Sequence, residues 1–473
     1  MSLSAQKHFE VADQARFAEA SGDWNPMHMD PLAARRTQMG APVIHGMHLA
    51  LSCLDAFSQM SNDPPSLTGI SIHFVKPAFV GETLTFTASD LDPLKLMAQV
   101  EGVRVMTIDL TKGPTEKAFD GSKDAPTLAP GVRIPRERSF GEIEKAAGVR
   151  ERIVLSNGSE KLFPSAARWI GKDRVNALAS FSTLVGMECP GLHSIFVSLN
   201  IELTEDGPLN HLEYAVVSTD DRFRRVKMSV SGGGWKGLLD AAVRNPPVLQ
   251  PSLGEMARKV PSGSFKGQRV LVVGGSRGIG EYTAKAVAAG GAQVVLTYAV
   301  GLEEAQALVA EMKEFGSEAE HLPFDVRFPA EAQLDRLTFS PTHVYYFATC
   351  RISRPRKDAF DPALYQEFQQ FYVKGFYDLC SALRKRTDGF FVFYPSSIYV
   401  NPEGRPKGLA EYAMAKGEGE ALCADLSQLL PGVEARVKRL PRLPTDQTAS
   451  LGPTSGEESM DILLPLIREM QGG

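Results

Sequence analysis

The spacing of apolar residues divides the first half of the chain into helices and strands. From His48 to Met60 they recur at helical intervals, which predicts a helix with one packed face. A second run of apolar and small residues, 175–185, also predicts a helix. It leads into three stretches in which apolar and polar residues alternate, as in half-buried strands: 196–203, 211–218 and 224–230. The pattern indicates an α+β arrangement in which a helix is followed by several strands.

The second half of the chain has a different pattern. A continuous apolar run, 270–273, predicts a buried strand. A glycine-rich turn, a helix from Glu281 to Ala289 and another strand from Gln293 to Tyr298 follow it. Strand, helix and strand in this order form a βαβ unit, whose strands lie parallel in one sheet. We therefore expect an α/β doubly wound domain here.

Length and proline content indicate where these regions separate. A chain of 473 residues is too long for one hydrophobic core, and roughly two to four domains are expected. Residues 121–138 are rich in Gly, Pro, Lys and Arg without an apolar period, which indicates a linker. Residues 245–267 contain four prolines, which predicts a semi-rigid spacer. The predicted domains are 1–125, 140–245 and 265–473.

Composition argues against several classes of function. The net charge is -5 and no basic run is present, so nucleic acid is not the expected partner. No apolar window is long enough to cross a bilayer, and the N-terminus lacks the core of a signal peptide. The five cysteines are scattered, so we expect buried thiols in a reducing cytoplasm, with no metal site and no disulfide framework.

Potential catalytic side chains are most concentrated between residues 21 and 30. Around one proline, this stretch contains an acid, an amide and an imidazole: Asp23, Asn25 and His28. An acid and a histidine held close together can position one water, and a helix N-terminus such as the one expected at Gly46 can polarise a carbonyl. The same residues also form ordinary turns, since Asp and Asn bond their own backbone and Pro fixes φ.

This block, with Ile44-His45-Gly46-Met47 downstream and the stretch 74–84, resembles the MaoC-like, R-specific enoyl-CoA hydratases of the hotdog fold. The resemblance implies that Asp23 and His28 hold the water and that Asn25 supports them. It also implies that the Gly46 amide faces the thioester oxygen.

The region 140–245 fits a second hotdog and has no counterpart of this block. Resemblance to double-hotdog hydratases implies that it shapes the acyl channel without catalysing. Its acid–base candidates are His193 and Glu188, and a histidine beside an apolar run is more often packed or exposed than catalytic.

The turn after residues 270–273 has the composition of a dinucleotide site. Its residues are Gly274, Ser276, Arg277, Gly278, Ile279 and Gly280. Between a strand and a helix, the glycines allow a tight turn, close approach to a pyrophosphate and close helix packing. The strand ending at Tyr298 has no acid for the ribose hydroxyls of NAD. An unpaired Arg277 suits a 2′-phosphate, which predicts NADPH.

A strand ending at Ser397 and a helix with Tyr412 and Lys416 supply a second set of reactive groups. Tyr and Lys at i, i+4 share one helix face, where an ammonium lowers the phenol pKa and makes Tyr412 a usable acid. Residues 265–440 resemble the short-chain dehydrogenase/reductases, especially the 3-oxoacyl-carrier-protein reductases. The resemblance implies that Tyr412 donates a proton and that Lys416 holds the nicotinamide ribose. Ser397, or less favourably Ser396, positions the carbonyl.

The same resemblance places Asp325 and Val326 at the adenine, but other positions depart from the family pattern. Tyr346-Phe347-Ala348-Thr349 stands where the family has Asn-Asn-Ala-Gly, and Tyr372 stands where a catalytic asparagine is usual. The segment after Lys416 is short, which predicts a reduced substrate lid. These departures admit a domain that binds cofactor and turns over slowly.

The expected protein is a bifunctional enzyme of acyl-thioester metabolism. It would reduce a 3-oxoacyl thioester with NADPH and interconvert the (R)-3-hydroxyacyl product with the trans-2-enoyl thioester. The acyl chain would arrive on an acyl-carrier protein or on CoA, and either a homodimer or the internal second copy would pair the hotdogs. Two alternatives stay open: a reductase acting on a non-thioester carbonyl, and a scaffold that binds an acyl-carrier protein without reacting.

Overall fold

The computed structural model describes residues 4–61, 63–89, 94–114, 131–208, 210–352, 360–448 and 460–470. The chain forms two compact units, which meet in sequence between Pro246 and Pro247. Four of the five cysteines are buried, Cys350 is half-buried, and none forms a disulfide. Within the described ranges, no helix is long and apolar enough to cross a membrane.

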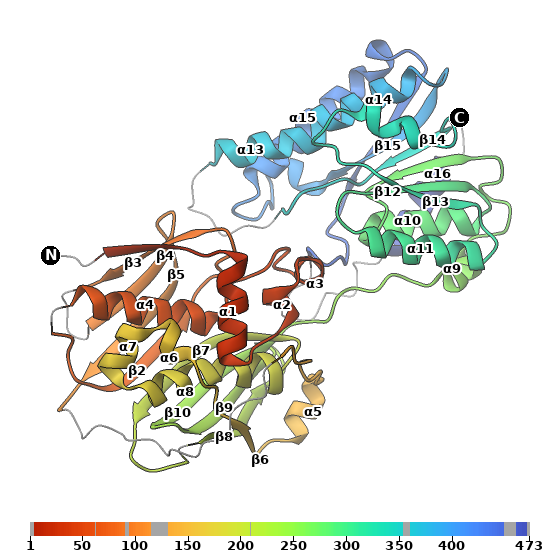
Figure 1. The fold of residues 1–473 in the computed structure, drawn as a ribbon. Helices are drawn as coiled ribbons and strands as arrows, with labels where there is room; N and C mark the ends of the chain where they lie inside the picture. The colour runs from red at the N-terminus through yellow and green to blue at the C-terminus, as the bar shows by residue number, and fades with distance from the viewer. Residues whose placement is uncertain are drawn as a thin grey trace. The chain divides into compact units, whose positions relative to one another are not determined.

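The first unit is built on one antiparallel sheet of ten strands in the order β1-β3-β4-β5-β2-β7-β10-β9-β8-β6 (Figure 1). The strands are β1 Ser4–His8, β2 Leu67–Phe74, β3 Thr83–Ala88, β4 Leu94–Val100, β5 Val103–Lys112, β6 Arg150–Val154, β7 Ser194–Leu203, β8 His211–Asp220, β9 Arg225–Gly232 and β10 Trp235–Val243. The order in the second half repeats that of the first about the β2–β7 pair, where Ser71 lies opposite Asn200. The predicted duplicated hotdog fold is confirmed, and the repeat shows in strand pairing.

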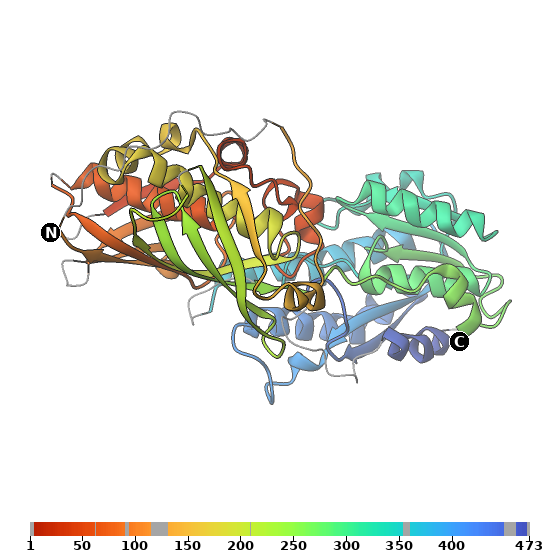
Figure 2. The ribbon, with the colours of Figure 1, turned by 90° about the horizontal axis from the view of Figure 1, so that it is seen from below.

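Two helices carry the core of this unit. α4 (Gly46–Met60) and α8 (Lys172–Thr183), which continues as a π-helical segment Leu184–Glu188, contact each other, and each precedes one strand of the central β2–β7 pair. Buried residues of both halves form one hydrophobic cluster, so the two hotdogs share a single core. α4 and α8 lie on one face of the sheet (Figure 2). The shorter helices of this unit are α1 Val11–Ser21, α2 Pro26–Met29, α3 Pro31–Arg35, α5 Phe140–Lys145, α6 Ser159–Leu162 and α7 Pro164–Ile170.

The second unit is a parallel sheet of six strands in the order β13-β12-β11-β14-β15-β16. The strands are β11 Arg269–Val273, β12 Gln293–Tyr298, β13 Ala319–Pro323, β14 His343–Tyr346, β15 Phe390–Ser397 and β16 Val433–Leu440. Their order reverses between β11 and β14, the switch point at which doubly wound sheets bind ligands. The predicted α/β doubly wound fold is confirmed.

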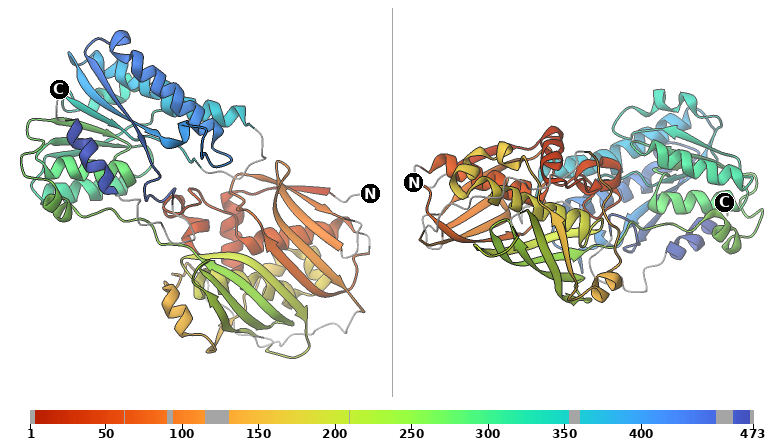
Figure 3. Two further views of the ribbon diagram at one scale, coloured as in Figure 1. Left: turned by 180° about the vertical axis from the view of Figure 1, so that it is seen from behind. Right: turned by 60° about the horizontal axis from the view of Figure 1, so that its bottom comes forward.

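Helices cover both faces of this parallel sheet (Figure 3), and a separate hydrophobic cluster lies on each face. They are α9 Leu253–Lys259, α10 Gly278–Ala289, α11 Leu302–Glu314, α12 Ala330–Gln333, α13 Pro362–Gln369, α14 Gly375–Arg384, α15 Ala410–Leu429 and α16 Leu463–Glu469. A π-helical segment, Gln370–Lys374, joins α13 to α14.

The proline-rich segment 245–267, predicted as a spacer, contains the helix α9. Ser252 and Glu255 form a capping box at its N-terminus, and Leu253 and Met256 are buried in the core of the second unit. The spacer prediction is wrong for this stretch, because a capping box and apolar residues three apart define a packed helix between the prolines. Most of the other predicted linker, 121–130, lies outside the described residues.

Candidate active sites

The turn between α1 and α2 builds the first candidate site. α1 ends at Ser21, and the next residue, Gly22, adopts the left-handed conformation with φ 84°. The Asn25 side chain caps α2 by accepting a hydrogen bond from the amide two residues on, at 3.0 Å, and Pro26 occupies the first helical position. The turn that the sequence allows is therefore formed. It also directs the side chains of Asp23 and His28 toward the same space.

Asp23 is almost completely buried, with 1% of its surface exposed. Its Oδ2 accepts a hydrogen bond from Ser182 Oγ at 2.6 Å, and its Oδ1 accepts one from the Asn25 amide at 3.1 Å. Burial raises the pKa of the Asp23 carboxyl, while His28 and Ser182 oppose the rise. A Cβ at Gly186 would lie 2.5 Å from Oδ1, so glycine is required there. Because Ser182 and Gly186 come from the second half, the site needs both hotdogs.

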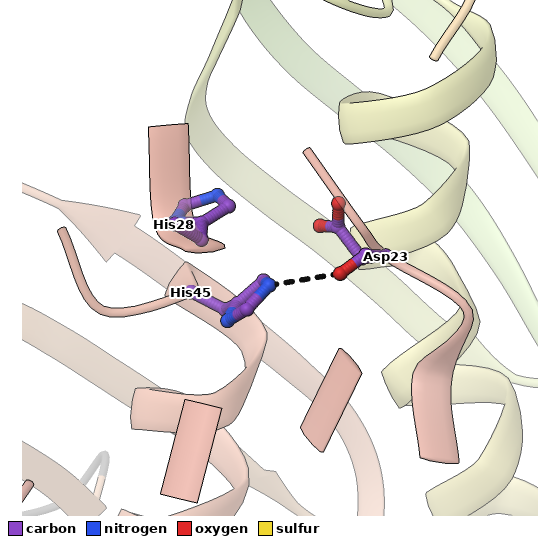
Figure 4. A group of neighbouring side chains, drawn as sticks. All are labelled: Asp23, His28 and His45. Atoms are coloured by element: carbon purple, nitrogen blue, oxygen red, sulfur yellow. Dashed lines mark hydrogen bonds between the residues drawn. The ribbon is translucent and has the colours of Figure 1, made fainter. Parts of the chain in front are cut away.

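His28 faces the Asp23 carboxylate, and His45 lies beside both (Figure 4). His28 Nδ1 is 2.8 Å from the Val43 carbonyl oxygen. Since a carbonyl only accepts, Nδ1 carries the proton and Nε2 is left as an acceptor. Burial lowers the pKa of His28 and lowers that of His45 well below its usual value. The two rings stack with centroids 4.0 Å apart, and both are neutral at pH 7.

These three side chains form the one group of potential metal ligands that converges among the described residues. Their ligand atoms lie within 4.8 Å of one another. Each ring nitrogen of His45, however, already faces an oxygen: Gln14 Oε1 at 2.8 Å and the Asp23 carbonyl at 3.0 Å. Because the Asp23 carbonyl only accepts, Nε2 carries the proton of the neutral His45 ring and offers no lone pair to a metal at this point. Two acceptors, the Asp23 carboxylate and His28 Nε2, remain to hold the two protons of a water.

Asn25 and Gly46 complete this site in different ways. Asn25 Nδ2 donates to the Gly186 carbonyl at 2.8 Å and lies 3.4 Å from the Leu192 carbonyl, so it ties the turn to the second half. Gly46 is the first residue of α4, where backbone amides have no intrahelical partner. A Cβ at Gly46 would lie 3.0 Å from the Phe74 ring, so this ring packs more closely against Gly46 than a side chain would allow.

The acid–base candidates of the second half have other partners. His193 Nε2 lies 3.0 Å from Glu137 Oε1. The Glu188 carboxylate pairs with Arg133 at 3.3 Å and with Arg136 at 3.0 Å. Both candidates therefore bind residues 131–138, His193 through a hydrogen bond, because burial lowers its pKa, and Glu188 through ion pairs.

The glycine turn of the second unit has the geometry of a dinucleotide site. Gly274 and Gly278 have positive φ, 74° and 58°. A Cβ at Gly280 would lie 2.2 Å from the Gly274 carbonyl oxygen, so close helix packing requires glycine. α10 begins at Gly278, directly after Ser276 and Arg277, with Ile279 in its first turn. The helix N-terminus and the bare turn together fit a pyrophosphate.

Two side chains of the expected cofactor site are already paired. Arg277 Nη1 lies 3.7 Å from Asp446 Oδ2, so the prediction of an unpaired arginine is wrong. Its partner comes from the segment after β16, which no sequence spacing places there. The Asp325 carboxylate is bound by Arg327 at 2.6–3.1 Å, and Val326 is buried beside it. β12 still ends without an acid, the feature that disfavours NAD.

Ser397 interacts with the Tyr412 phenol and opposes the rise of its pKa, whereas Ser396 Oγ is bound to a glutamate of α15. Burial raises the pKa of Tyr412 to about 12. Burial also lowers the pKa of Lys416 to about 7, and its Nζ donates to the Pro395 carbonyl at 2.7 Å. The expected lowering of the Tyr412 pKa is therefore wrong for this structure, because desolvation dominates and the opposing contribution comes from Ser397 and not from the Lys416 amine.

Tyr372 fills the space beside these residues. Its ring centroid is 4.0 Å from Lys416 Nζ and 5.6 Å from the Tyr412 ring, and its hydroxyl is 2.5 Å from Thr349 Oγ1. The two departures from the family pattern, Tyr372 and Thr349, thus contact each other within one site. The predicted reduced lid falls partly on 449–459, outside the described residues.

Sequence analysis missed two of these residues, Ser182 and Asp446. Ser182 is 159 positions from Asp23 in sequence, and a serine in an apolar helix carries no chemical signal. Asp446 follows the last strand of the sheet and belongs to no motif recognised in the sequence.

Comparisons with known proteins agree with the two units. The family model of the MaoC like domain matches residues 2–111, and that of the short chain dehydrogenases matches residues 268–338. An (R)-specific enoyl-CoA hydratase of Aeromonas caviae is 39% identical over 80 residues, covering 17% of this chain and 60% of the hydratase. The 3-oxoacyl-[acyl-carrier-protein] reductase of Aggregatibacter actinomycetemcomitans is 31% identical over 173 residues, covering 34% of this chain and 71% of the reductase.

Among solved structures, a short chain dehydrogenase from Burkholderia cenocepacia in complex with NADP aligns with a TM-score of 0.40 at 23% identity, covering 44% of this chain and 92% of the other. Fold and sites together define a double hotdog joined to a dinucleotide-binding domain. The chain belongs to the short-chain dehydrogenase family through its second unit and carries a MaoC-like domain at its N-terminus.

Proposed function

We propose that the first unit hydrates trans-2-enoyl thioesters and dehydrates (R)-3-hydroxyacyl thioesters. The observation that carries this proposal is the buried Asp23 carboxylate facing the unprotonated Nε2 of His28. A water held by both acceptors turns an oxygen lone pair toward the substrate C3. One of the two acceptors takes its proton as the C–O bond forms, and a proton returns to C2.

The N-terminus of α4 supplies the second requirement of this reaction. Addition of water to an enoyl thioester places negative charge on the thioester oxygen, which amides at a helix N-terminus stabilise. Gly46 is the residue whose amide would face that oxygen. Ser182 keeps Asp23 oriented and favours its ionised form. The named activity of the Aeromonas relative, enoyl-CoA hydration, supports this assignment.

We propose that the second unit reduces a 3-oxoacyl thioester to the (R)-3-hydroxyacyl thioester with NADPH, which supplies the hydride. The glycine turn and the α10 N-terminus would hold the pyrophosphate. Tyr412 would donate the proton to the carbonyl oxygen, which Ser397 would position. Arg277 would bind the 2′-phosphate, either while it remains paired with Asp446 or after this ion pair is replaced. The product of this step is the substrate for dehydration by the first unit, and the acyl chain would travel on CoA or an acyl-carrier protein.

The test measures both activities on variants of the full chain. Asp23→Asn and His28→Ala should each lower crotonyl-CoA hydration by about 10² or more, the usual scale of acid–base catalysis. Both should leave NADPH oxidation with acetoacetyl-CoA within a few-fold of wild type. Near-normal hydration by either folded variant would contradict the assignment.

A second candidate concerns the reductase substrate. Tyr372 and Thr349 fill the site next to Tyr412 and Lys416 with a bonded pair that the family pattern lacks. This observation favours a reductase that acts on a carbonyl other than a 3-oxoacyl thioester. NADPH oxidation measured with acetoacetyl and longer 3-oxoacyl thioesters, and with non-thioester ketones, separates the two candidates.

A further inference from the structure

Lys416 on α15 is a buried amine whose neighbours are mainly aromatic. It is 6% exposed, and its Nζ donates a hydrogen bond to the Pro395 carbonyl at 2.7 Å. Glu420, an acid one turn further along the helix, is paired with Arg439 at 2.7–2.8 Å instead. Burial lowers the pKa of Lys416 to about 7, so its ammonium form depends on support from the surrounding side chains.

Two tyrosine rings supply that support. Nζ of Lys416 lies 4.0 Å from the ring centroid of Tyr372 and 4.9 Å from that of Tyr394, and both rings are fully buried. A cation within about 6 Å of an aromatic face is attracted by the ring quadrupole, most strongly where water is excluded. The two rings and the Pro395 carbonyl, which we call the Lys416 cage, therefore favour the ammonium form and hold it in one place.

Contacts from several elements fix the two rings of the cage. Tyr372 lies in the π-helical segment between α13 and α14, and its carbonyl accepts a hydrogen bond from the Tyr394 hydroxyl at 3.0 Å. The Tyr372 hydroxyl lies 2.5 Å from Thr349 Oγ1. A Cβ at Gly419, in the middle of α15, would overlap the Tyr394 hydroxyl, so this arrangement requires glycine there.

The Tyr372 ring also contacts the expected proton donor. The ring of Tyr412 packs edge-on against it, with centroids 5.6 Å apart. Tyr412 and Lys416 lie one turn apart on the same face of α15, so one ring packs against both. The asparagine that is usual at this position has no ring face and could not hold an ammonium in this way.

Resting on the proposed reductase function, we propose that Tyr372 is a positioning residue of the reductase site. Its ring, together with that of Tyr394, holds the Lys416 ammonium beside Tyr412, in place to bind the nicotinamide ribose of NADPH. The attraction between the ammonium and the ring face, and not packing alone, is what Tyr372 contributes.

The experiment replaces Tyr372 in the full chain by phenylalanine and then by phenylalanines that carry one, two and three ring fluorines. Fluorine withdraws electrons from the ring face and weakens its attraction for a cation with little change of shape. NADPH affinity, measured by calorimetric titration, should stay within a few-fold of wild type in Tyr372→Phe. It should then fall stepwise, by about tenfold with three fluorines. Tyr372→Leu, which has no ring, should lose at least as much.

The melting temperature of the cofactor-free protein gives a second readout. Fluorination at position 372 should lower it stepwise, and Lys416→Met should abolish this dependence, because no ammonium remains over the ring. Tyr345→Phe with the same fluorines is the matched control, since Tyr345 is also buried and its ring packs on Phe347 and Phe393. Its series should change neither NADPH affinity nor the melting temperature stepwise.

A series at Tyr372 that does not respond to fluorine would overturn the inference. So would an equal response in the Lys416→Met background or at Tyr345. If the wild type binds NADPH but reduces no 3-oxoacyl thioester, the proposed function fails while the fluorine series still tests the cage. If reduction is normal and the series is flat, the Tyr372 inference alone fails.

Discussion

Ser182→Ala tests the claim that the second hotdog completes the active site of the first. The change deletes one hydroxyl, which donates to Asp23 Oδ2 at 2.6 Å inside a fully buried site. A hydrogen bond to a buried charged group contributes about 1.5–3 kcal/mol. Because each 1.36 kcal/mol is tenfold in rate, kcat/KM for hydration should fall about 10-fold to 150-fold where Asp23 must be ionised.

The pH dependence follows from the same bond with a definite sign. Ser182 stabilises the carboxylate and so lowers the Asp23 pKa against the effect of burial. Its removal raises that pKa further, which moves the acid limb of the kcat/KM profile to higher pH. The deficit of Ser182→Ala should therefore be largest at low pH and shrink as pH rises. The assay follows loss of enoyl-thioester absorbance with crotonyl-CoA.

Ser180→Ala is the matched control, because Ser180 is equally buried on the same helix and bonds to Asn176 and Ser156 instead of Asp23. It should cost about 1–2 kcal/mol of stability by thermal or urea unfolding and leave hydration within a few-fold. Wild-type hydration by Ser182→Ala across the pH range would refute the reasoning. So would equal losses in the two serine variants.

Three further predictions test other parts of the chain. Gly186→Ala would place a Cβ 2.5 Å from Asp23 Oδ1, so hydration should fall by about 10² or more. The reductase activity should persist. An unchanged hydration rate would show that the Asp23 carboxylate does not lie beside Gly186. NADPH should bind more tightly than NADH in calorimetric titration, and Arg277→Ala should narrow the gap; equal wild-type affinities would remove the cofactor argument. Tyr412→Phe should abolish NADPH-dependent ketoreduction and keep hydration within a few-fold, because Tyr412 belongs to a different unit from Asp23 and His28. Full reductase activity would exclude Tyr412 as the proton donor.

The local motifs of this chain could be predicted because short-range chemistry determines them. The helix His48–Met60 lies within α4, and the alternating stretches 196–203, 211–218 and 224–230 correspond to β7, β8 and β9 within a few residues. The strand–turn–helix at 270–289 forms as the apolar run and the glycines indicate. Periodicity, capping and glycine conformations are properties of neighbouring residues, so one sequence contains them.

Pairing between distant segments could not be read in the same way. The β2–β7 pair that joins the hotdogs and the Ser182–Asp23 bond link residues more than 100 positions apart. The Arg277–Asp446 pair is of the same kind. One sequence does not identify the serine that binds Asp23 or the acid that pairs with Arg277, because many serines and acids in the chain have the same local sequence pattern.

The sequence by itself determined the two fold classes, the Asp23–His28 block, the glycine turn and the Ser397, Tyr412 and Lys416 set. Only the tertiary structure determines the pKa values of these groups. Burial raises the pKa of Tyr412 to about 12 and lowers that of Lys416 to about 7, against the expectation from their spacing. Desolvation and through-space charge depend on everything packed around a group, and that surrounding exists only after the chain has folded.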